Sequence, residues 1–284
     1  MSNLENIFEG RRVVIATQHQ KERVIGPILE KEFGLFSFVP IDFDTDLLGT
    51  FSGEVERKKN PLETVRQKCL MAMEATHCDL GIASEGSFGP HPSLFFISAD
   101  EEWLILIDKK NNLEIVVREL STQTNFNGME VTSEKQLLDF AESVQFPSHA
   151  LILRKSKEEA SEIAKGINDF TKLKVVFNSL FEKDNRVYAE TDMRAMHNPS
   201  RMRVIENATR ELVKRMQSLC PECKTPGFSI TDAKKGLPCG LCGTPTNSIL
   251  SHIFSCQHCG FSKEAHFPHG KESEDPTYCD YCNP

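Results

Sequence analysis

The sequence predicts an α/β fold, in which a mixed, twisted sheet is flanked by helices, followed by a small zinc-ribbon module. Short β-branched apolar runs alternate with segments of helical periodicity over most of the chain. Two longer runs, at residues 101–108 and 113–120, are separated by a polar turn typical of a β-hairpin, so part of the sheet is expected to be antiparallel. Four Cys-x-x-Cys pairs then close the chain. We therefore expect an α/β domain over residues 10–215 and a zinc-binding module over residues 216–284.

The first elements are expected to be a strand, a loop and a helix. Residues 12–17 form an apolar run rich in β-branched side chains, which indicates a strand. Apolar residues then recur at helical spacing from Lys21 to Phe33, and Gly34 ends this helix. A second apolar run, residues 36–43, is bounded by aspartates and indicates another strand.

A helix and an acidic strand end come next. The helix begins at Asn60, because Pro61 suits a first helical turn. Its expected buried face comprises Leu62, Val65, Cys69, Ala72 and Met73. Residues 79–84 then indicate a buried strand, and the glycine-rich residues 85–89 indicate a turn. Since α/β folds place their chemistry at the carboxyl ends of strands, Glu85 is a candidate functional residue.

The rest of the α/β domain is expected to alternate between helices and strands. We expect a helix over residues 134–144, a strand over 150–153, a helix over 157–167 and a strand over 173–177. A last helix follows Pro199. Its apolar residues recur at near-helical intervals, at Val204, Ala208, Leu212 and Met216. This helix leads directly into the first cysteine pair.

The cysteine pairs predict two zinc ions. They are Cys220/Cys223, Cys239/Cys242, Cys256/Cys259 and Cys279/Cys282. Two residues between two thiolates allow both sulfurs to bind one ion, and two pairs complete the tetrahedral four-sulfur shell of structural Zn²⁺. Because such shells are closed, the two zinc ions are expected to be structural and not catalytic.

Two zinc ions can share the four pairs in two ways. Sequential pairing joins the first pair with the second and the third with the fourth, which suits two small zinc ribbons, and this is the arrangement we expect. Alternate pairing joins the first pair with the third and the second with the fourth, and would interleave the two sites. That alternative stays open at the level of the sequence.

Disulfides are the competing explanation for so many cysteines. The chain begins without the cationic start and apolar core of a secretory signal. No run approaches the ~18 consecutive apolar residues of a membrane helix. A reducing, cytoplasmic setting without membrane contact is therefore expected, in which the thiolates stay free for metal.

The charge of the chain argues against nucleic-acid binding. The formal net charge is −8. From Met216 to Pro284, five lysines stand against seven aspartates and glutamates. Two four-thiolate zinc sites would each add a net charge of about −2, so the module would be a poor phosphate clamp.

Three segments of the α/β domain resemble a known superfamily. They are Val13-Val-Ile-Ala-Thr17 with Lys21 after it, Glu63-Thr-Val-Arg-Gln-Lys68-Cys-Leu-Met-Ala72, and Leu80-Gly-Ile-Ala-Ser-Glu85-Gly86. Their order is similar to the phosphate loop, acidic helix and acidic strand end of the inosine-triphosphate pyrophosphatase-like superfamily, especially its non-standard purine nucleoside triphosphate phosphatases. The whole chain also resembles a set of bacterial proteins that join such a domain to a cysteine-rich tail and have no assigned function.

The resemblance implies a pyrophosphatase-like fold and metal-assisted attack of water on a nucleoside triphosphate, which releases a monophosphate and pyrophosphate. Mg²⁺ would be held by Glu85 and Glu63, since this ion binds one or two carboxylates and completes its shell with waters and phosphate oxygens. The phosphates would contact Thr17, Lys21 and Lys68, and Lys68 would lie at the reacting centre with the two glutamates.

A late arginine segment completes the resemblance. Arg194, Arg201 and Arg203 stand in a position similar to the superfamily's Ser-His-Arg segment, and would close over the triphosphate. The chain also departs from the superfamily pattern. His19 replaces the usual asparagine, and the loop before Lys21 is one residue shorter.

Two functions therefore stay open. The first is a nucleotide-binding enzyme that hydrolyses nucleoside triphosphates with Mg²⁺. The second is a non-enzymatic adaptor, in which the zinc module binds a protein partner or a second copy of the chain.

Overall fold

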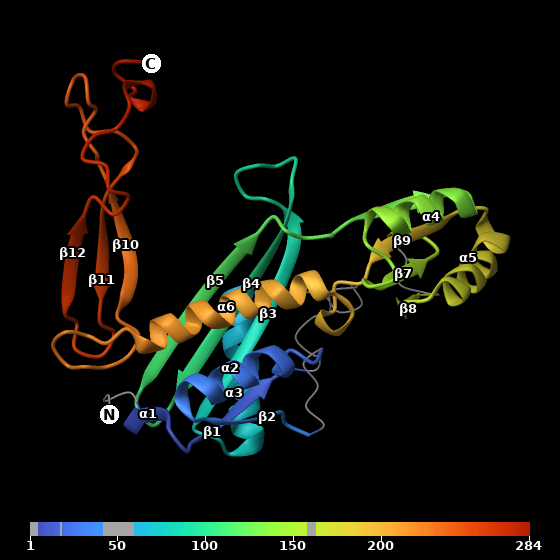
Figure 1. Cartoon of the computed structure of the whole chain (residues 1–284), viewed down its shortest axis with the longest axis horizontal. Coiled ribbons are helices and arrows are strands. Elements are labelled where there is room, and N and C mark those ends of the chain that lie inside the picture. Colours follow the sequence, from blue (N-terminus) through green and yellow to red (C-terminus); the bar gives the residue numbers. More distant parts are fainter. Residues whose placement is uncertain (1–4, 18, 42–59, 158–162) are drawn as a thin grey trace.

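The computed structural model describes the whole chain except residues 1–4, 18, 42–59 and 158–162. It confirms the predicted fold class, because helix-flanked mixed sheets precede the cysteine-rich tail (Figure 1). A five-stranded sheet forms the centre of the α/β part, a four-stranded sheet forms a second lobe, and a three-stranded sheet forms the tail (Figure 1). Among the described helices, none is long and apolar enough to cross a membrane.

The central sheet combines parallel and antiparallel strands. Its order is β2 (Phe36–Phe38), β1 (Arg12–Ala16), β3 (Leu80–Pro90), β4 (Ser98–Asp108) and β5 (Leu113–Ser121). β1 is parallel to β2 and β3, whereas β3, β4 and β5 are antiparallel. The predicted hairpin between β4 and β5 is thus confirmed. The predicted second strand is confirmed over β2, and residues 42 and 43 of that run lie outside the described residues.

Helices cover both faces of the central sheet. α2 (Glu22–Phe33) and α6 (Pro199–Gln217) lie on one face, and α3 (Pro61–Thr76) covers the other (Figure 1). A short helix, α1 (Glu5–Phe8), precedes β1. Alternate residues of each strand supply the two cores: Ile82 belongs to the core under α2 and α6, and Ala83 to the core under α3. All three long helices agree with the sequence prediction.

The predicted turn at residues 85–89 is wrong, because β3 continues to Pro90. Glu85 lies opposite Trp103 of β4, within an unbroken antiparallel register. The backbone hydrogen bonds of this pairing hold the glycine-rich segment extended. β1 ends opposite Ala83, so β3 and β4 run past its carboxyl end. Side chains of this extension lie next to the loop that joins β1 to α2.

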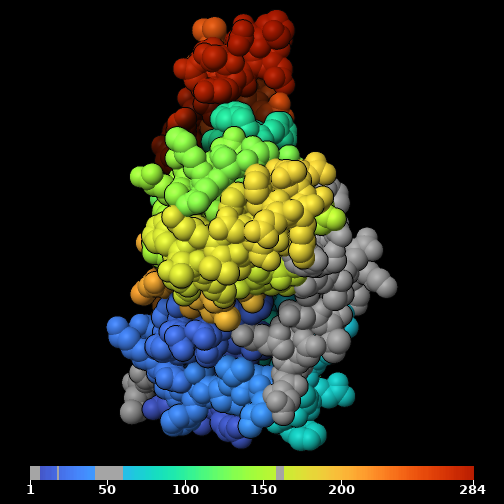
Figure 2. Space-filling view, turned by 90° about the vertical axis from the view of Figure 1, so that its right-hand side faces the viewer, coloured from blue at the N-terminus to red at the C-terminus, as the bar shows by residue number. Residues whose placement is uncertain are grey.

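The second lobe is inserted between β5 and α6. Its elements are β6 (Gly128–Val131), α4 (Glu134–Ser143), β7 (Leu151–Arg154), β8 (Ala164–Ile167), α5 (Phe170–Asp184) and β9 (Val187–Thr191). The strands are antiparallel in the order β6-β9-β7-β8, and they share a hydrophobic core with the two helices. Figure 2 shows this lobe from its outer end, in green and yellow. α4 and β7 confirm the predicted helix and strand at these positions.

The predicted helix over residues 157–167 is wrong at its carboxyl end, where residues 164–167 form β8. Residues 158–162 of that prediction lie outside the described part of the chain. Gly166 has a φ of 66°, a conformation that favours glycine, and β8 pairs with β7. Strand pairing therefore overrides a composition that is typical of a helix.

The predicted strand over residues 173–177 is also wrong, because this segment lies inside α5. Asp169 caps the helix by accepting a hydrogen bond from the backbone amide of Lys172. Leu173 and Phe177 are both buried, one helical turn apart. The short apolar run is thus one face of a helix, and periodicity over so few residues does not separate the two structures.

The tail is a three-stranded antiparallel sheet. It comprises β10 (Ser229–Lys235), β11 (Ile249–Ser255) and β12 (Ser262–His266). Short helical turns lie before α6, at η2 (Ala195–His197), and near the end of the chain, at η3 (Pro276–Tyr278). Figure 1 shows the tail standing beside the end of α6, with the carboxyl terminus at its far end.

Candidate metal centres and a buried charge cluster

The eight tail cysteines form two groups of four, each of which could hold a metal ion. One group is Cys220, Cys223, Cys256 and Cys259, and the other is Cys239, Cys242, Cys279 and Cys282. Within each group the sulfur atoms lie within 4.8 Å of one another. In the first group, the sulfur of Cys220 lies 3.6 Å from that of Cys259, and the sulfur of Cys223 lies 3.5 Å from that of Cys256. In the second group, the distances are 3.9 Å from Cys239 to Cys282 and 3.7 Å from Cys242 to Cys279. A tetrahedron with Zn–S bonds of ~2.3 Å has edges of about 3.8 Å, so both groups fit zinc.

The same distances exclude disulfides, whose sulfur atoms are ~2.05 Å apart. All ten cysteines are free thiols in the structure. The two groups are therefore suited to two structural zinc ions, as the spacing of the pairs predicts.

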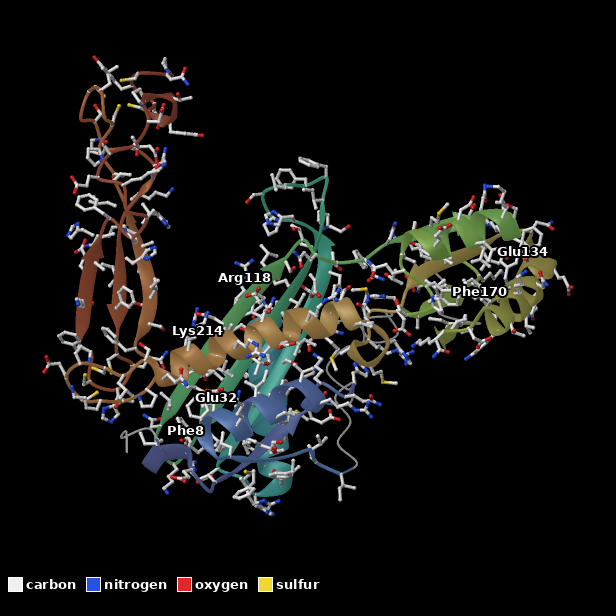
Figure 3. All side chains as sticks on the ribbon, in the orientation of Figure 1. Phe8, Glu32, Arg118, Glu134, Phe170 and Lys214 are labelled. Atoms are coloured by element: carbon white, nitrogen blue, oxygen red, sulfur yellow. The ribbon has the colours of Figure 1, made fainter. Side chains whose placement is uncertain are left out.

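The expected sequential pairing is wrong: the first pair joins the third, and the second joins the fourth. The direction of the strands explains this. The first pair precedes β10 and the second follows it, so these pairs lie at opposite ends of a strand about 20 Å long. β11 then returns the chain to the first pair, and β12 carries it away again. Figure 3 shows the sulfur atoms, in yellow, gathered at the two ends of the tail sheet.

Three of the four cysteine pairs share one backbone turn. The residue after the second cysteine is left-handed in each case, with φ of 62° at Lys224, 74° at Gly243 and 72° at Gly260. Its amide donates to the carbonyl of the first cysteine of its pair, at 3.0, 2.9 and 3.0 Å respectively. This turn brings both thiolates of a pair to one side, where one ion can bind them.

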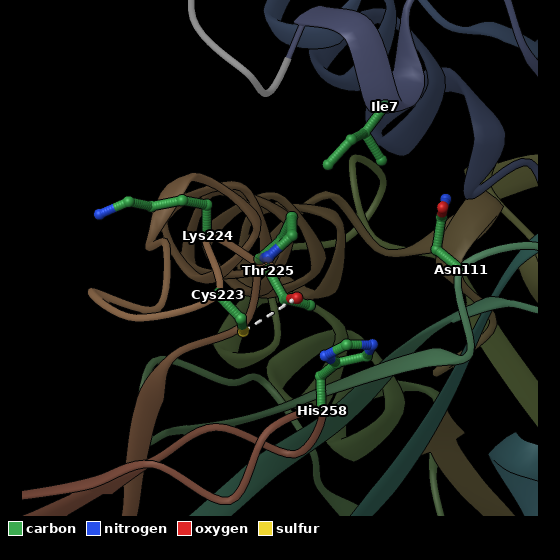
Figure 4. Close-up of a pocket in the computed structure, with 7 residues that line it drawn as sticks. Ile7, Asn111, Cys223, Lys224, Thr225 and His258 are labelled. Atoms are coloured by element: carbon green, nitrogen blue, oxygen red, sulfur yellow. Dashed lines mark hydrogen bonds between the residues drawn. The ribbon is translucent and has the colours of Figure 1, made fainter.

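The first cysteine group lies against the α/β part. A cavity of about 350 Å³ separates the Cys223 turn and His258 from Ile7 and Asn111 (Figure 4). Beside it, the amide of Gly227 donates to the carbonyl of Arg215 at the end of α6, at 3.1 Å. The geometry of this zinc group is thus linked to the last turn of α6.

A group of candidate functional side chains lies in the α/β part, at the carboxyl end of β1. It consists of Lys21, Lys68, Glu85, Asp100, Glu102 and Arg201, and all six are buried. We call this set the charge cluster. Four of its members are residues predicted from the sequence, and Thr17, also predicted, is buried at the start of the adjacent loop.

The charge cluster spans both faces of the central sheet. On the α3 face, the Lys68 ammonium donates to a carboxylate oxygen of Glu85. On the opposite face, Arg201 Nε donates to Glu102 Oε1 at 2.6 Å. Lys21 Nζ lies 3.8 Å from Glu102 Oε2. The extended part of β3 and β4 therefore carries paired charges on each side.

The loop that joins β1 to α2 lies close to four cations. His19, on this loop, has its pKa lowered to about 3, first by burial and then by the surrounding cations. These cations are Lys21, Arg201, Arg194 and Lys68. The ammonium of Lys21 donates to Ser84 Oγ at 2.9 Å. Each of the four cations is paired with a carboxylate, which belongs to Glu85, Glu102 or Asp192.

Two members of the charge cluster, Asp100 and Glu102, were missed by the sequence analysis. Three of their carboxylate oxygens accept no hydrogen bond from the described residues: both oxygens of Asp100, and Oε2 of Glu102. Burial, followed by repulsion from Glu102, raises the pKa of Asp100 to about 8. The sequence does contain a signal that these acids are buried. Asp100, Glu102 and the core residues Leu104 and Leu106 are alternate residues of β4, so their side chains lie on the same face of the strand.

Two other predicted site residues lie away from the cluster, and one lies at its edge. Glu63 is exposed on the first turn of α3, where its amide donates to Asn60 Oδ1 at 2.9 Å. Arg203 is exposed on α6 and donates to Ser200 Oγ at 3.0 Å. Arg194 is half-buried and pairs with Asp192, with a shortest nitrogen–oxygen distance of 2.6 Å, yet its charge still reaches His19.

Gly86 provides the space for the Glu102–Arg201 pair. A Cβ added at Gly86 would overlap Glu102 Oε1 and would lie 2.5 Å from Arg201 Nη2. We expect Gly86→Ala to destabilise the central sheet by about 1–3 kcal/mol, because the added methyl group would displace two side chains that are buried and paired with each other. Gly89→Ala is the matched control on the same strand, since a Cβ there meets nothing within 4 Å. Urea unfolding followed by the fluorescence of Trp103, the single tryptophan, compares the two. Equal stabilities would contradict the proposed role of Gly86.

Comparison with known proteins gives a family for most of the chain. The family described as "Domain of unknown function (DUF6671)" matches residues 68–284. The match includes both cysteine groups and every member of the charge cluster except Lys21. A search of curated proteins finds no match.

Proposed function

Because the chain belongs to the DUF6671 family, whose description assigns no function, we propose a function from the two sites. The α/β part binds the triphosphate of a nucleotide and, with Mg²⁺, hydrolyses it to a monophosphate and pyrophosphate, while the tail holds two structural zinc ions. The observation that supports the nucleotide is the convergence of four cations on the loop of His19.

The local structure supports an anionic ligand. Lys21 is the N-cap residue of α2, and among the described residues no side chain caps this helix end. Helix N-termini bind phosphates through their free amides and the positive end of the helix dipole. Lys21 and Lys68 would contact phosphate oxygens as point charges, and Arg201 would offer its fork of donors. The three cations are held by carboxylates from different strands, so their positions are set before a ligand binds.

The proposed reaction uses water as the nucleophile. The water oxygen forms a bond to the α-phosphorus, the bond from that phosphorus to the oxygen bridging to the β-phosphate breaks, and pyrophosphate leaves with the bonding electrons. The proton of the water passes to a carboxylate, for which Glu85 is our candidate. Mg²⁺ would neutralise the developing charge on the phosphate oxygens. Arg194 would approach the outer phosphates from the side of the second lobe.

The zinc ions take no part in this chemistry. Four thiolates would complete the shell of each zinc ion, so neither ion would have a position for water or substrate. The two groups lie at opposite ends of a small sheet, and metal binding would supply much of the folding free energy of the tail.

A second function, that of an adaptor, is supported by the surface around the second cysteine group. Leu241, Tyr278 and Tyr281 are 74%, 67% and 76% exposed, and each adjoins a cysteine of that group. Exposed apolar side chains gathered around one point are typical of protein contacts. Capture of a protein partner by the wild-type tail, and its loss in Leu241→Ser/Tyr281→Ser with both zinc ions retained, would favour this function.

A turnover assay tests the nucleotide proposal. The full-length, zinc-loaded protein is incubated with Mg²⁺ and a panel of standard and deaminated nucleoside triphosphates, and pyrophosphate is measured. Glu85→Gln is expected to lower turnover by about 10²-fold or more, because it removes the proton acceptor. Lys110→Met, a change on the exposed β4–β5 turn, is the control and should match the wild type. Absence of pyrophosphate with every nucleotide, or full activity of Glu85→Gln, would defeat the proposal as stated.

Binding of a triphosphate is expected to weaken as the pH rises from about 7 to about 9. Burial lowers the pKa of Lys21 to about 8, against the opposing attraction of Glu102, so the ammonium loses its proton within this range. The other charges that act on it belong to Arg201, Lys68 and Glu85. A neutral amine no longer attracts phosphate, and Asp100, whose pKa is also about 8, gains a negative charge in the same range. Lys21→Met should therefore bind weakly and depend less on pH than the wild type. Titration with a non-hydrolysable triphosphate measures both, and an identical pH dependence in the variant would contradict the role of Lys21.

A further inference from the structure

We propose that Asp100 and Glu102 form a binding site for a divalent cation of the magnesium class, beside the proposed phosphate site. The proposal rests on the proposed function only for the phosphate that would share the ion. The two carboxylates belong to the protein, and their affinity for a cation can be measured without a nucleotide.

The backbone places both carboxylates on one face of the sheet. Asp100 and Glu102 are two residues apart on β4, and successive side chains of a strand alternate between faces. They lie opposite Phe88 and Gly86 of β3. Both acids are completely buried, with an exposed fraction of 0%.

Three of the four carboxylate oxygens are available as metal ligands. Glu102 Oε1 accepts a hydrogen bond from Arg201, but Glu102 Oε2 and both oxygens of Asp100 have no donor among the described residues. A buried carboxylate without a donor is strongly unfavourable unless a cation or a proton satisfies it. A cation bound by these two carboxylates would supply the missing partner.

The chemistry of the ligands selects the ion. Carboxylate oxygens are hard ligands, and Mg²⁺ is commonly held by one or two of them while it keeps several waters. Arg201 and Lys21 act electrostatically on Asp100 and are our proposed phosphate contacts, so phosphate oxygens would be close enough to complete the shell of the ion. Zinc would favour the cysteine groups of the tail.

A proton on Asp100 is the competing explanation. A buried carboxyl that carries a proton is neutral and needs no cation to satisfy its charge. Asparagine then closely matches the neutral acid in shape, and Asp100→Asn is expected to fold. The variant keeps the buried polar group but loses a charged ligand.

The test uses Mn²⁺ alone as the probe, with full-length, zinc-loaded protein at neutral pH. Trp103 follows Glu102 directly and is the single tryptophan of the chain, so it gives a unique indole N–H resonance. Mn²⁺ at Asp100 and Glu102 would broaden this resonance, whereas Mn²⁺ bound to the tail would not. We expect the broadening to saturate in the wild type and to require at least about tenfold more Mn²⁺ in Asp100→Asn.

Glu101→Gln is the matched control, because this residue lies between the two acids but its side chain pairs with Arg118 on the other face. It should titrate like the wild type. An unbroadened indole resonance in the wild type, or equal titrations of Asp100→Asn and wild type, would overturn the cation site. Broadening of the indole resonance without any pyrophosphate release would uphold the cation site and defeat the proposed hydrolysis. Nucleotide turnover without broadening would uphold the hydrolysis and overturn the cation site.

Discussion

Replacing Cys220 and Cys256 together with serine is expected to leave about one zinc ion per chain, whereas replacing Cys220 and Cys239 together is expected to remove both. Cys220 and Cys256 belong to one four-sulfur group, and Cys239 belongs to the other. Sequential pairing of the cysteine pairs predicts the opposite result, because it would assign Cys220 and Cys239 to the same ion. Metal analysis of the purified, gel-filtered variants distinguishes the two arrangements.

The structural effect of losing the first zinc ion should be larger than that of losing the second. Structural zinc ions contribute about 10–16 kcal/mol to the folding of small zinc modules at neutral pH. The first group lies against the α/β part, and Gly227 beside it is bonded to the last turn of α6. We therefore expect Cys220→Ser/Cys256→Ser to increase amide exchange in the tail and at the end of α6.

Two controls complete this experiment. Cys239→Ser/Cys279→Ser removes the second ion, and faster exchange should then be confined to the far end of the tail. Cys78→Ser changes a cysteine outside both groups and should retain two zinc ions. Retention of one ion by Cys220→Ser/Cys239→Ser would refute the alternate pairing.

The zinc ligands were predictable from the sequence, but their pairing was not. The Cys-x-x-Cys spacing is a local property, because two intervening residues determine whether both thiolates reach one ion. The partner of each pair depends on where the chain goes in between. Only the antiparallel course of β10 and β11 returns the third pair to the first, and this course is stabilised by pairing between strands that are distant in sequence.

The charge cluster was also predictable only in part, because some of its members depend on strand pairing that the local sequence does not reveal. Lys21, Lys68, Glu85 and Arg201 were expected from the sequence to share a site, and the structure brings them to one end of β1. Asp100 and Glu102 lie in a strand that the sequence does predict, but their meaning depends on which face of that strand is buried. Reading the phase of Leu104 and Leu106 back along β4 would have placed both acids inside the protein.

The extension of β3 shows the limit of local signals. Glycines near Glu85 suggested a turn, yet they are accommodated in a strand that pairs with β4 over its whole length. Position 86 requires glycine because the buried pair of Glu102 and Arg201 lies against its backbone, and not because the chain reverses direction there. A glycine in a strand therefore marked the close approach of a charged pair, which a single sequence does not reveal.

That buried pair gives the second large effect: Arg201→Met is expected to destabilise the central sheet by about 3–5 kcal/mol. Both Arg201 and Glu102 have side-chain exposures of 0%, and Arg201 also donates to the carbonyl of Met193. Removing the guanidinium leaves the buried carboxylate of Glu102 next to Asp100, with the ammonium of Lys21 3.8 Å from Glu102 Oε2. Urea unfolding followed by Trp103 fluorescence measures the loss.

A surface pair on the same helix provides the control for this prediction. Arg210 pairs with Glu206 four residues before it, and these side chains are 59% and 39% exposed. Arg210→Met should cost no more than about 0.5 kcal/mol, because exposed pairs are well solvated before and after the change. The double variant Arg201→Met/Glu102→Gln should be more stable than Arg201→Met alone, since it also removes the buried charge. If the double variant were the less stable of the two, the cost would arise from lost packing of Arg201, and the electrostatic account of the charge cluster would be wrong.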